Sequence, residues 1–218
     1  MKSSLWFECD SLPPFLASVT SLLLAIVAST SAQCPSQCDC EKAATSLYVN
    51  CRGKGLTEIP AGIPEATTNL DLRSNHIAII PDGIFSELKL GALRQLRFDN
   101  NDLTEIRVGT FTGLPRLTHL HLAYNKISQI EDRAFASVPS LGYLQIYHNK
   151  LEKIGQNVLF GLSRLVQLYA CCMRTLTSID DGAFSHVGNL RQLILSSTNL
   201  QQPAVDFRLS FMPRLDSL

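Results

Sequence analysis

An excess of charge of one sign is absent from this sequence. Its 19 lysine and arginine residues balance its 19 aspartate and glutamate residues, so the formal net charge is zero. Nucleic-acid binding needs a basic stripe on one face, and this balance gives no sign of one. The chain also contains no glycine-rich phosphate loop, no GxSxG turn and no HExxH sequence. We therefore expect no nucleic-acid partner, no enzyme activity and no cofactor.

Apolar runs long enough to span a membrane are missing as well. The longest run, FLASVTSLLLAIVA at 15–28, has 14 residues, whereas a membrane-spanning helix needs about 20. Small residues follow it, and Thr30 and Ala32 fit the preference of signal peptidase. We predict a signal peptide over 1–32. A retained signal anchor is the alternative, because acidic residues accompany Lys2 before the apolar run.

Cysteines are few and unevenly placed. Six follow the predicted signal peptide, and this even number fits an oxidising compartment. The first four have the spacing C-x3-C-x-C-x10-C: Cys34, Cys38, Cys40 and Cys51. Zinc sites favour paired CxxC units, so we expect disulfides here rather than a metal. The protein is therefore predicted to be secreted or to lie on the extracellular side of the plasma membrane.

An internal repeat dominates the rest of the chain. Residues 93–106, 117–130 and 141–154 share the pattern LxxLxLxxNxLxxI. Copies of this frame, 24 to 26 residues apart, begin at Thr67, Leu93, Leu117, Leu141, Leu165 and Leu190, with a seventh at Leu215. One copy cannot bury enough apolar surface to fold alone, so the copies must stack as a solenoid. The two leucines of LxL point the same way from a short strand, and successive strands must be parallel.

Two columns of equivalent residues are assigned structural roles. The asparagines at the ninth position of the frame are predicted to satisfy backbone groups where the strand turns away. They are Asn75, Asn101, Asn125 and Asn149. Apolar residues at a later position are predicted to stack as a spine: Phe85, Phe111, Phe135, Leu159, Phe184 and Leu209. Met173 and Thr198 interrupt the asparagine column. An extra residue before Leu176 predicts an irregular backbone over 171–176.

The cysteine-rich segment and the first frame carry a family resemblance. CPSQCDC (34–40), CRGKGLTEIPAGIP (51–64) and TTNLDLRSN (67–75) resemble the N-terminal cap and first repeat of extracellular leucine-rich-repeat proteins. The variable lymphocyte receptors of jawless vertebrates are most similar, and small leucine-rich proteoglycans, Slit proteins and Toll-like receptor ectodomains are looser matches. The resemblance implies an α/β solenoid, a horseshoe with a parallel concave β-sheet and an irregular or 3-10 convex side. It also implies the bridges Cys34–Cys40 and Cys38–Cys51.

The expected domain layout follows from these segments. Residues 1–32 form the signal peptide, 33–66 the disulfide-bonded cap, and 67–218 six repeats with an incomplete seventh. The chain stops at LDSL, four residues into a repeat and without a cysteine-containing C-terminal cap. An uncovered solenoid end exposes its core. We therefore expect the natural chain to continue beyond Leu218 to a cap or a membrane anchor.

The outward positions of the strands provide the candidate binding surface. Four of the five tyrosines and three of the five histidines of the chain lie there or at its edge. Asp71 and Ala123 are expected to be outward too. The candidate ligand-binding residues are Arg73, Arg97, Asp99, His119, His121, Tyr143, Gln145, Tyr147 and Tyr169. Tyrosine and arginine are typical of interface anchors. A merely solvated polar face is the alternative.

Three further expectations concern histidine, cysteine and overall function. His119, His121 and His148 are not expected to bind a metal, because no carboxylate or cysteine completes a site; their protonation is predicted to weaken binding near pH 6. Cys171 and Cys172 leave three states open: inert thiols, a vicinal disulfide, or a linked dimer. We predict a receptor-like or antigen-receptor-like module that recognises a protein or glycan ligand on its concave face. A secreted matrix-organising protein of the proteoglycan type is the alternative.

Overall fold

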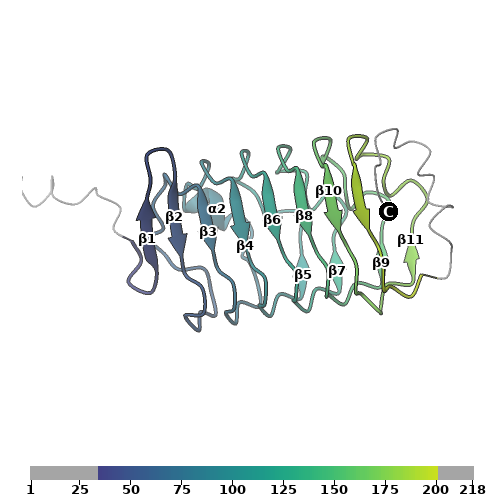
Figure 1. Cartoon of the computed structure of the whole chain (residues 1–218), viewed down its shortest axis with the longest axis horizontal. Helices are drawn as coiled ribbons and strands as arrows, with labels where there is room; N and C mark the ends of the chain where they lie inside the picture. The colour runs from purple at the N-terminus through teal and green to yellow at the C-terminus, as the bar shows by residue number, and fades with distance from the viewer. Residues whose placement is uncertain (1–33, 201–218) are drawn as a thin grey trace, which may run out of the picture. The chain divides into compact units, whose positions relative to one another are not determined.

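The computed structural model describes residues 34–200, which form a solenoid with one long sheet along its side (Figure 1). The predicted signal peptide, Leu209 and the seventh frame lie outside the described residues. Eight strands lie side by side in the order β1-β2-β3-β4-β6-β8-β10-β12. Their bounds are Asp39–Lys42 (β1), Leu47–Asn50 (β2), Asn69–Asp71 (β3), Gln95–Arg97 (β4), His119–His121 (β6), Tyr143–Gln145 (β8), Gln167–Tyr169 (β10) and Gln192–Ile194 (β12).

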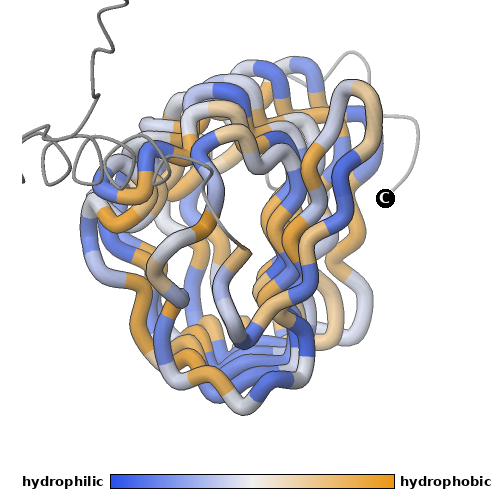
Figure 2. The backbone as a smooth tube through the Cα atoms, turned by 90° about the vertical axis from the view of Figure 1, so that its left-hand side faces the viewer, coloured by the Kyte–Doolittle hydropathy of each residue, from blue (hydrophilic) through white to orange (hydrophobic). Residues whose placement is uncertain are grey.

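Strand register places equivalent leucines opposite one another. β1 and β2 are antiparallel, and every later pair in this sheet is parallel, which confirms the predicted direction. The central leucines of the frames form one fully buried row: Leu70, Leu96, Leu120, Leu144, Leu168 and Leu193. Figure 2, which looks along the solenoid, shows the successive coils behind one another. Because side chains alternate along a strand, the residues beside each leucine face outward.

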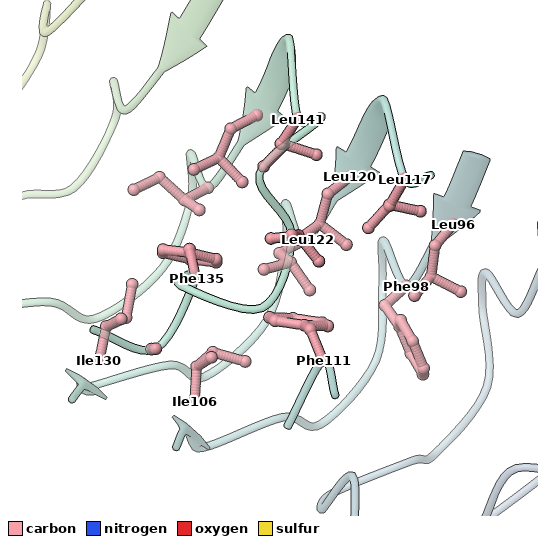
Figure 3. Packing of buried hydrophobic residues seen from close by; sticks show 14 of the residues in the cluster. Leu96, Phe98, Ile106, Phe111, Leu117, Leu120, Leu122, Ile130, Phe135 and Leu141 are labelled. Carbon is pink, nitrogen blue, oxygen red and sulfur yellow. The ribbon is translucent and has the colours of Figure 1, made fainter. Parts of the chain in front are cut away.

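The predicted spine is present in the core. The ring centroids of Phe85 and Phe111 are 6.5 Å apart and those of Phe111 and Phe135 are 5.8 Å apart, with nearly parallel planes. Leu159 and Phe184 continue the column and are buried. In the close-up of Figure 3, Phe111 and Phe135 lie below the leucines that come from the strand side of the coils.

The convex side is irregular, which confirms the expectation of an irregular or 3-10 convex side, and residues 34–200 contain no 3-10 helix. It carries two short parallel ladders, β5 (Glu105–Ile106) with β7 (Gln129–Ile130) and β9 (Lys153–Ile154) with β11 (Ser178–Ile179). One four-residue helix, α2 (Ile84–Glu87), precedes β4. The remaining return segments are turns with isolated i to i+3 hydrogen bonds, which do not propagate into a helix. No helix within 34–200 is long and apolar enough to cross a bilayer.

The asparagine column joins neighbouring coils by hydrogen bonds. Asn101 Oδ1 accepts from the Ile77 backbone N–H at 3.1 Å, and its Nδ2 donates to the carbonyls of Leu72 at 2.9 Å and Phe98 at 3.0 Å. Asn75, Asn125 and Asn149 make the corresponding bonds, and all four are buried. Each amide therefore satisfies backbone groups of its own coil and of the preceding one.

The fifth frame departs from this arrangement at Met173. The Met173 side chain is buried, but its thioether cannot donate the hydrogen bonds that an asparagine amide makes. A turn at 174–175 accommodates the extra residue, and there the Leu176 N–H donates to the Met173 carbonyl at 3.0 Å. In the sixth frame, Thr198 keeps one bond of the asparagine pattern, since its hydroxyl donates to the Leu195 carbonyl at 3.0 Å. The column is thus interrupted where the sequence lacks asparagine.

The N-terminal cap contributes the first two strands, β1 and β2, to the same eight-stranded sheet. Its disulfides are Cys34–Cys40 and Cys38–Cys51, which confirms the pairing that the resemblance implied. Cys38 and Cys51 are buried against the first repeat. β2 pairs in parallel with β3, so the cap adds its own outward residues to the concave face.

Candidate functional site

A row of aromatic rings crosses the concave face, which we define as the outward side of β2, β3, β4, β6, β8, β10 and β12. The centroid of Tyr143 on β8 lies 5.5 Å from His119 and 5.2 Å from His121, both on β6. On its other side, the Tyr169 ring of β10 lies at 5.4 Å. These separations are those of favourable aromatic pairs. The Gln145 amide donates to the Tyr143 hydroxyl, so Tyr143 is held by contacts from three strands.

A second group of rings lies at the edge where the chain leaves the strands. The Tyr124 ring stacks on His148 with centroids 4.4 Å apart and meets Tyr147 edge-on at 5.3 Å. Tyr124 and His148 have φ values of 54° and 52°, the left-handed conformation that recurs at this frame position in every repeat. The Tyr124 side chain is 46% exposed. The backbone turn thus presents these rings along the edge of the sheet.

At the charged end of the concave face, Asp71 does not lie as the sequence predicted. Asp71 was expected to point to solvent, yet it is fully buried. The Tyr48 hydroxyl donates to its Oδ2 at 2.9 Å, and Arg73 Nη2 donates to the same atom at 2.6 Å. Arg97 Nη1 lies 3.9 Å from that oxygen. Three long side chains therefore cover the short carboxylate.

Ala123 was also expected to face solvent, and it too is buried. Its equivalents in the adjacent coils are Asp99 and Tyr147, which are longer. The Ala123 backbone N–H donates to Asp99 Oδ1 at 3.2 Å, which draws that carboxylate over the alanine. A single methyl group between two larger neighbours contributes no exposed surface to the face.

A hollow of about 270 Å³ lies where the charged and aromatic parts meet. Its lining includes Arg52, Arg73, Ser74, Arg97, Asp99, Asn100, His121, Tyr124, Gln145 and Tyr147. Burial raises the pKa of Asp99, although His121 and Arg73 oppose that change. Burial also lowers the pKa of His121, against the opposing influence of the Gln145 hydrogen bond and the Asp99 charge. The hollow can therefore offer a ligand cations, a carboxylate and neutral hydrogen-bonding groups together.

The structure places all nine candidate residues on this face, and each is at least partly exposed. Six of them line the hollow: Arg73, Arg97, Asp99, His121, Gln145 and Tyr147. The other three belong to the ring row, to which His121 also contributes: His119, Tyr143 and Tyr169. The cap also supplies Tyr48 and Arg52, which were not among the predicted binding residues. The alternating segment LYVN at 47–50 is the signal that could have identified β2 as a further strand of this face.

The remaining candidate groups are the unpaired cysteines and the histidines. Cys171 and Cys172 are unpaired in the structure and both are partly exposed. Burial and the adjacent Cys172 raise the pKa of Cys171. The structure thus contains no vicinal disulfide between them, and inert thiols and a link to another chain stay the two alternatives. Among residues 34–200, no three His, Cys, Asp or Glu side chains are grouped so that they could hold a metal ion.

Comparison with known families matches both parts of the described structure. A family model for the leucine rich repeat matches residues 65–127, 91–146 and 115–170. A model for the leucine rich repeat N-terminal domain matches residues 33–64. These segments correspond to the coils and to the disulfide-bonded cap. The structure and these matches therefore agree on the same organisation from residue 34 to residue 170.

Curated relatives share this organisation over part of their length. The chain is 37% identical to trophoblast glycoprotein of Macaca fascicularis over 112 residues, which are 51% of this chain and 25% of that protein. It is 38% identical to leucine-rich repeat-containing protein 3 of Bos taurus over 101 residues, 46% of this chain and 38% of the relative. It is 39% identical to leucine-rich repeat-containing G-protein coupled receptor 5A of Xenopus laevis over 89 residues, 41% of this chain and 10% of the receptor. The matches therefore span well under two thirds of each relative.

Proposed function

Because this chain belongs to the leucine-rich repeat superfamily, we propose that it is a binding module whose concave face recognises a protein ligand. The same fold serves as an interaction scaffold rather than an enzyme across this superfamily. We place the module outside the cell, where its two cap disulfides would persist. One similar protein carries the word receptor in its name, which supports a receptor-like role.

The ring row around Tyr143 is the single observation that carries this proposal. His119, His121 and Tyr169 all lie within ring-contact distance of it, and the tyrosines are partly exposed. Rings held by one another lose little conformational freedom when a partner covers them. Aromatic side chains also contribute large apolar areas, and they dominate the energetics of protein interfaces. A solvated polar face would not need such a continuous aromatic row.

The charged hollow beside the row would set orientation and specificity. Asp71 neutralises much of the charge of Arg73, so Arg52 and Arg97 offer a ligand positive charge and Asp99 offers it a carboxylate. Charged groups beside an aromatic centre steer encounter and reject partners of the wrong charge pattern. We therefore expect a ligand that places an apolar or aromatic anchor on Tyr143 and polar groups over the hollow.

The proposal is tested with a panel of purified extracellular proteins. Any protein that binds the full chain is then titrated against Tyr143→Ala/Tyr169→Ala. Removing two anchors should weaken binding at least about tenfold, which corresponds to ~1.4 kcal/mol. Phe160→Ala is the matched control, since Phe160 is a half-exposed ring that packs on His186 away from the concave face. If the tyrosine variant binds its ligand as tightly as the Phe160→Ala control does, the concave face is not the binding surface.

A further inference from the structure

A column of charged side chains runs along the edge of the solenoid, directly after the asparagine column. Its members follow the ninth position of successive frames: His76, Asp102, Lys126, Lys150 and Arg174. The first three are linked, since His76 Nδ1 lies 3.4 Å from Asp102 Oδ2 and Lys126 Nζ lies 2.7 Å from Asp102 Oδ1. Lys150 and Arg174 are exposed, and neither has an ion pair within residues 34–200. The column thus begins neutralised and ends with two uncompensated cations.

These two cations line a cavity of about 580 Å³. His148, Thr175 and Ser197 contribute to its wall, and no carboxylate lines it among the described residues. Adjacent coils of a solenoid are only ~4.8 Å apart, so two like charges on neighbouring coils repel each other. Burial of an anion between Lys150 and Arg174 would relieve that repulsion. The cavity therefore has the charge and polarity of an anion site.

The wall of the cavity continues into the edge group of rings. His148 belongs to both, and its ring stacks on Tyr124 at 4.4 Å. Both residues are exposed, and ring surface not covered by this stacking can pack against the C–H faces of pyranose sugars. Two neighbouring cations in line with the solenoid, next to a pair of rings, suit a ligand that is linear, anionic at successive units and partly apolar on its sugar faces.

We propose that the edge between Lys126 and Arg174 binds a sulfated glycan chain. Arg174 can hold a sulfate or carboxylate by two parallel hydrogen bonds, whereas Lys150 acts as a point charge. Thr175 and Ser197 supply hydroxyl groups beside them, and the rings of Tyr124 and His148 carry the neighbouring sugar. This site lies beside the concave face and does not use Tyr143 or Tyr169. Tyr124 also lines the charged hollow, so the glycan site and the concave face adjoin at this ring.

A size-defined heparin oligosaccharide is the probe, titrated into the purified full chain at about physiological salt. Lys150→Glu/Arg174→Glu should weaken binding at least about tenfold, because both contacts become repulsive. Arg116→Glu/Arg164→Glu is the matched control, with the same change in net charge at two exposed arginines before β6 and β10. The control should stay within about twofold of the unsubstituted chain. Lys150→Gln/Arg174→Gln gives the same comparison without introducing acidic residues.

Several results would overturn the assignment. Failure of the unsubstituted chain to bind the oligosaccharide would do so, as would equal weakening by the control substitutions, which would indicate general charge attraction. If the desulfated oligosaccharide binds as tightly as the sulfated one, the sulfate groups have no role in binding. If polyglutamate displaces the heparin oligosaccharide as well as heparin itself does, the ligand is an acidic protein segment. Tyr143→Ala/Tyr169→Ala should leave heparin binding unchanged. Loss of heparin binding in that variant would move the glycan onto the concave face.

Discussion

The Arg73 guanidinium holds the fully buried carboxylate of Asp71, with Nη2 at 2.6 Å from Oδ2. Tyr48 donates to the same oxygen from the cap strand, and Arg97 approaches it from β4. Burial alone would raise the pKa of Asp71, but the hydrogen bonds from Arg73 and Tyr48 outweigh burial and hold that pKa below its usual value. The carboxylate therefore ties the cap to the first two repeats.

Asp71→Asn is expected to lower the free energy of unfolding by about 2 kcal/mol, because it leaves two arginines without their anion. The loss stays below that of a fully buried pair, since both guanidinium groups reach solvent. Chemical denaturation at neutral pH measures it. Asp82→Asn is the matched control, because Asp82 makes only an exposed pair with Arg107 at 3.5 Å, expected to contribute roughly 0–1 kcal/mol. Equal losses in the two variants would contradict the structural role of Asp71.

The contribution of Asp71 should also depend on pH. Its pKa is lower in the folded chain than the usual value of 3.8, so the unfolded chain binds more protons in acid. The stabilisation is present above the unfolded pKa and is lost as pH falls through the folded pKa. The stability difference between the unsubstituted chain and Asp71→Asn should therefore narrow only below about pH 4. A difference that narrows already between pH 7 and 5 would point to another group.

His119 and His121 should also make the stability of the fold depend on pH, in a range above that of Asp71. Burial lowers the pKa of both, with Arg97 adding to the effect at His119. The unfolded chain therefore takes up protons first, so stability is full above about pH 6.5 and is lost as pH falls through the folded pKa values. The melting temperature should be lower at pH 5.5 than at 7.5, and His119→Gln/His121→Gln should reduce that difference. His186→Gln, away from the concave face, should leave it unchanged.

Ligand binding on the concave face should weaken in the same acidic range. Protonated His119 and His121 would place new positive charge beside Arg97, at the centre of the aromatic row. Because the pKa of both histidines is lowered, this change falls at a lower pH than it would for exposed histidines. Affinity for an identified ligand at pH 7.5 and 5.5 measures the effect. Equal weakening in His119→Gln/His121→Gln would assign the pH dependence to other groups.

The coils were predictable because each depends on local, repeated information. The LxL pattern specifies an inward row, and six copies in register leave one way to stack the leucines Leu70 to Leu193. The buried asparagines follow from the same repetition, because equivalent backbone turns need equivalent partners. The cap pairing came from resemblance, since four cysteines allow three connectivities and spacing alone does not choose among them.

The departures arise where distant side chains meet. Asp71 occupies an outward position, yet Tyr48 reaches it from a strand 23 residues earlier and covers it. No periodic pattern encodes such a contact, because it depends on side-chain length and on which cap strand joins the sheet. The cavity that Lys150 and Arg174 line likewise includes Thr175, which belongs to the turn that accommodates the extra residue before Leu176. Repetition thus predicts the scaffold, and exceptions to the repetition set the details of the surfaces.

Asn125→Ala is expected to destabilise the fold by about 3 kcal/mol. It removes the acceptor for the Leu103 N–H at 3.1 Å and the donor to the Phe98 and Leu122 carbonyls, and buried unsatisfied backbone groups cost about 1–3 kcal/mol each before relaxation. Thr198→Ala loses one bond in the sixth frame, for about 1 kcal/mol. Urea unfolding of both variants tests the difference. Similar losses would mean that water replaces the asparagine amide.

The two cap disulfides should differ in what their removal does. Sequence separations of 13 for Cys38–Cys51 and 6 for Cys34–Cys40 predict similar entropic contributions, about 3 and about 2.4 kcal/mol. Cys51 is fully buried beside the first repeat, however, whereas Cys34 and Cys40 are partly exposed.

Cys38→Ser/Cys51→Ser therefore also places hydroxyl groups in the core and should open the sheet from its N-terminal end. Hydrogen exchange should become faster in β2 and β3 but not in β10, and Cys34→Ser/Cys40→Ser should affect β1 alone. Equal protection of β3 in the two double variants would show that the bridge to Cys51 is not what holds the cap on the repeats.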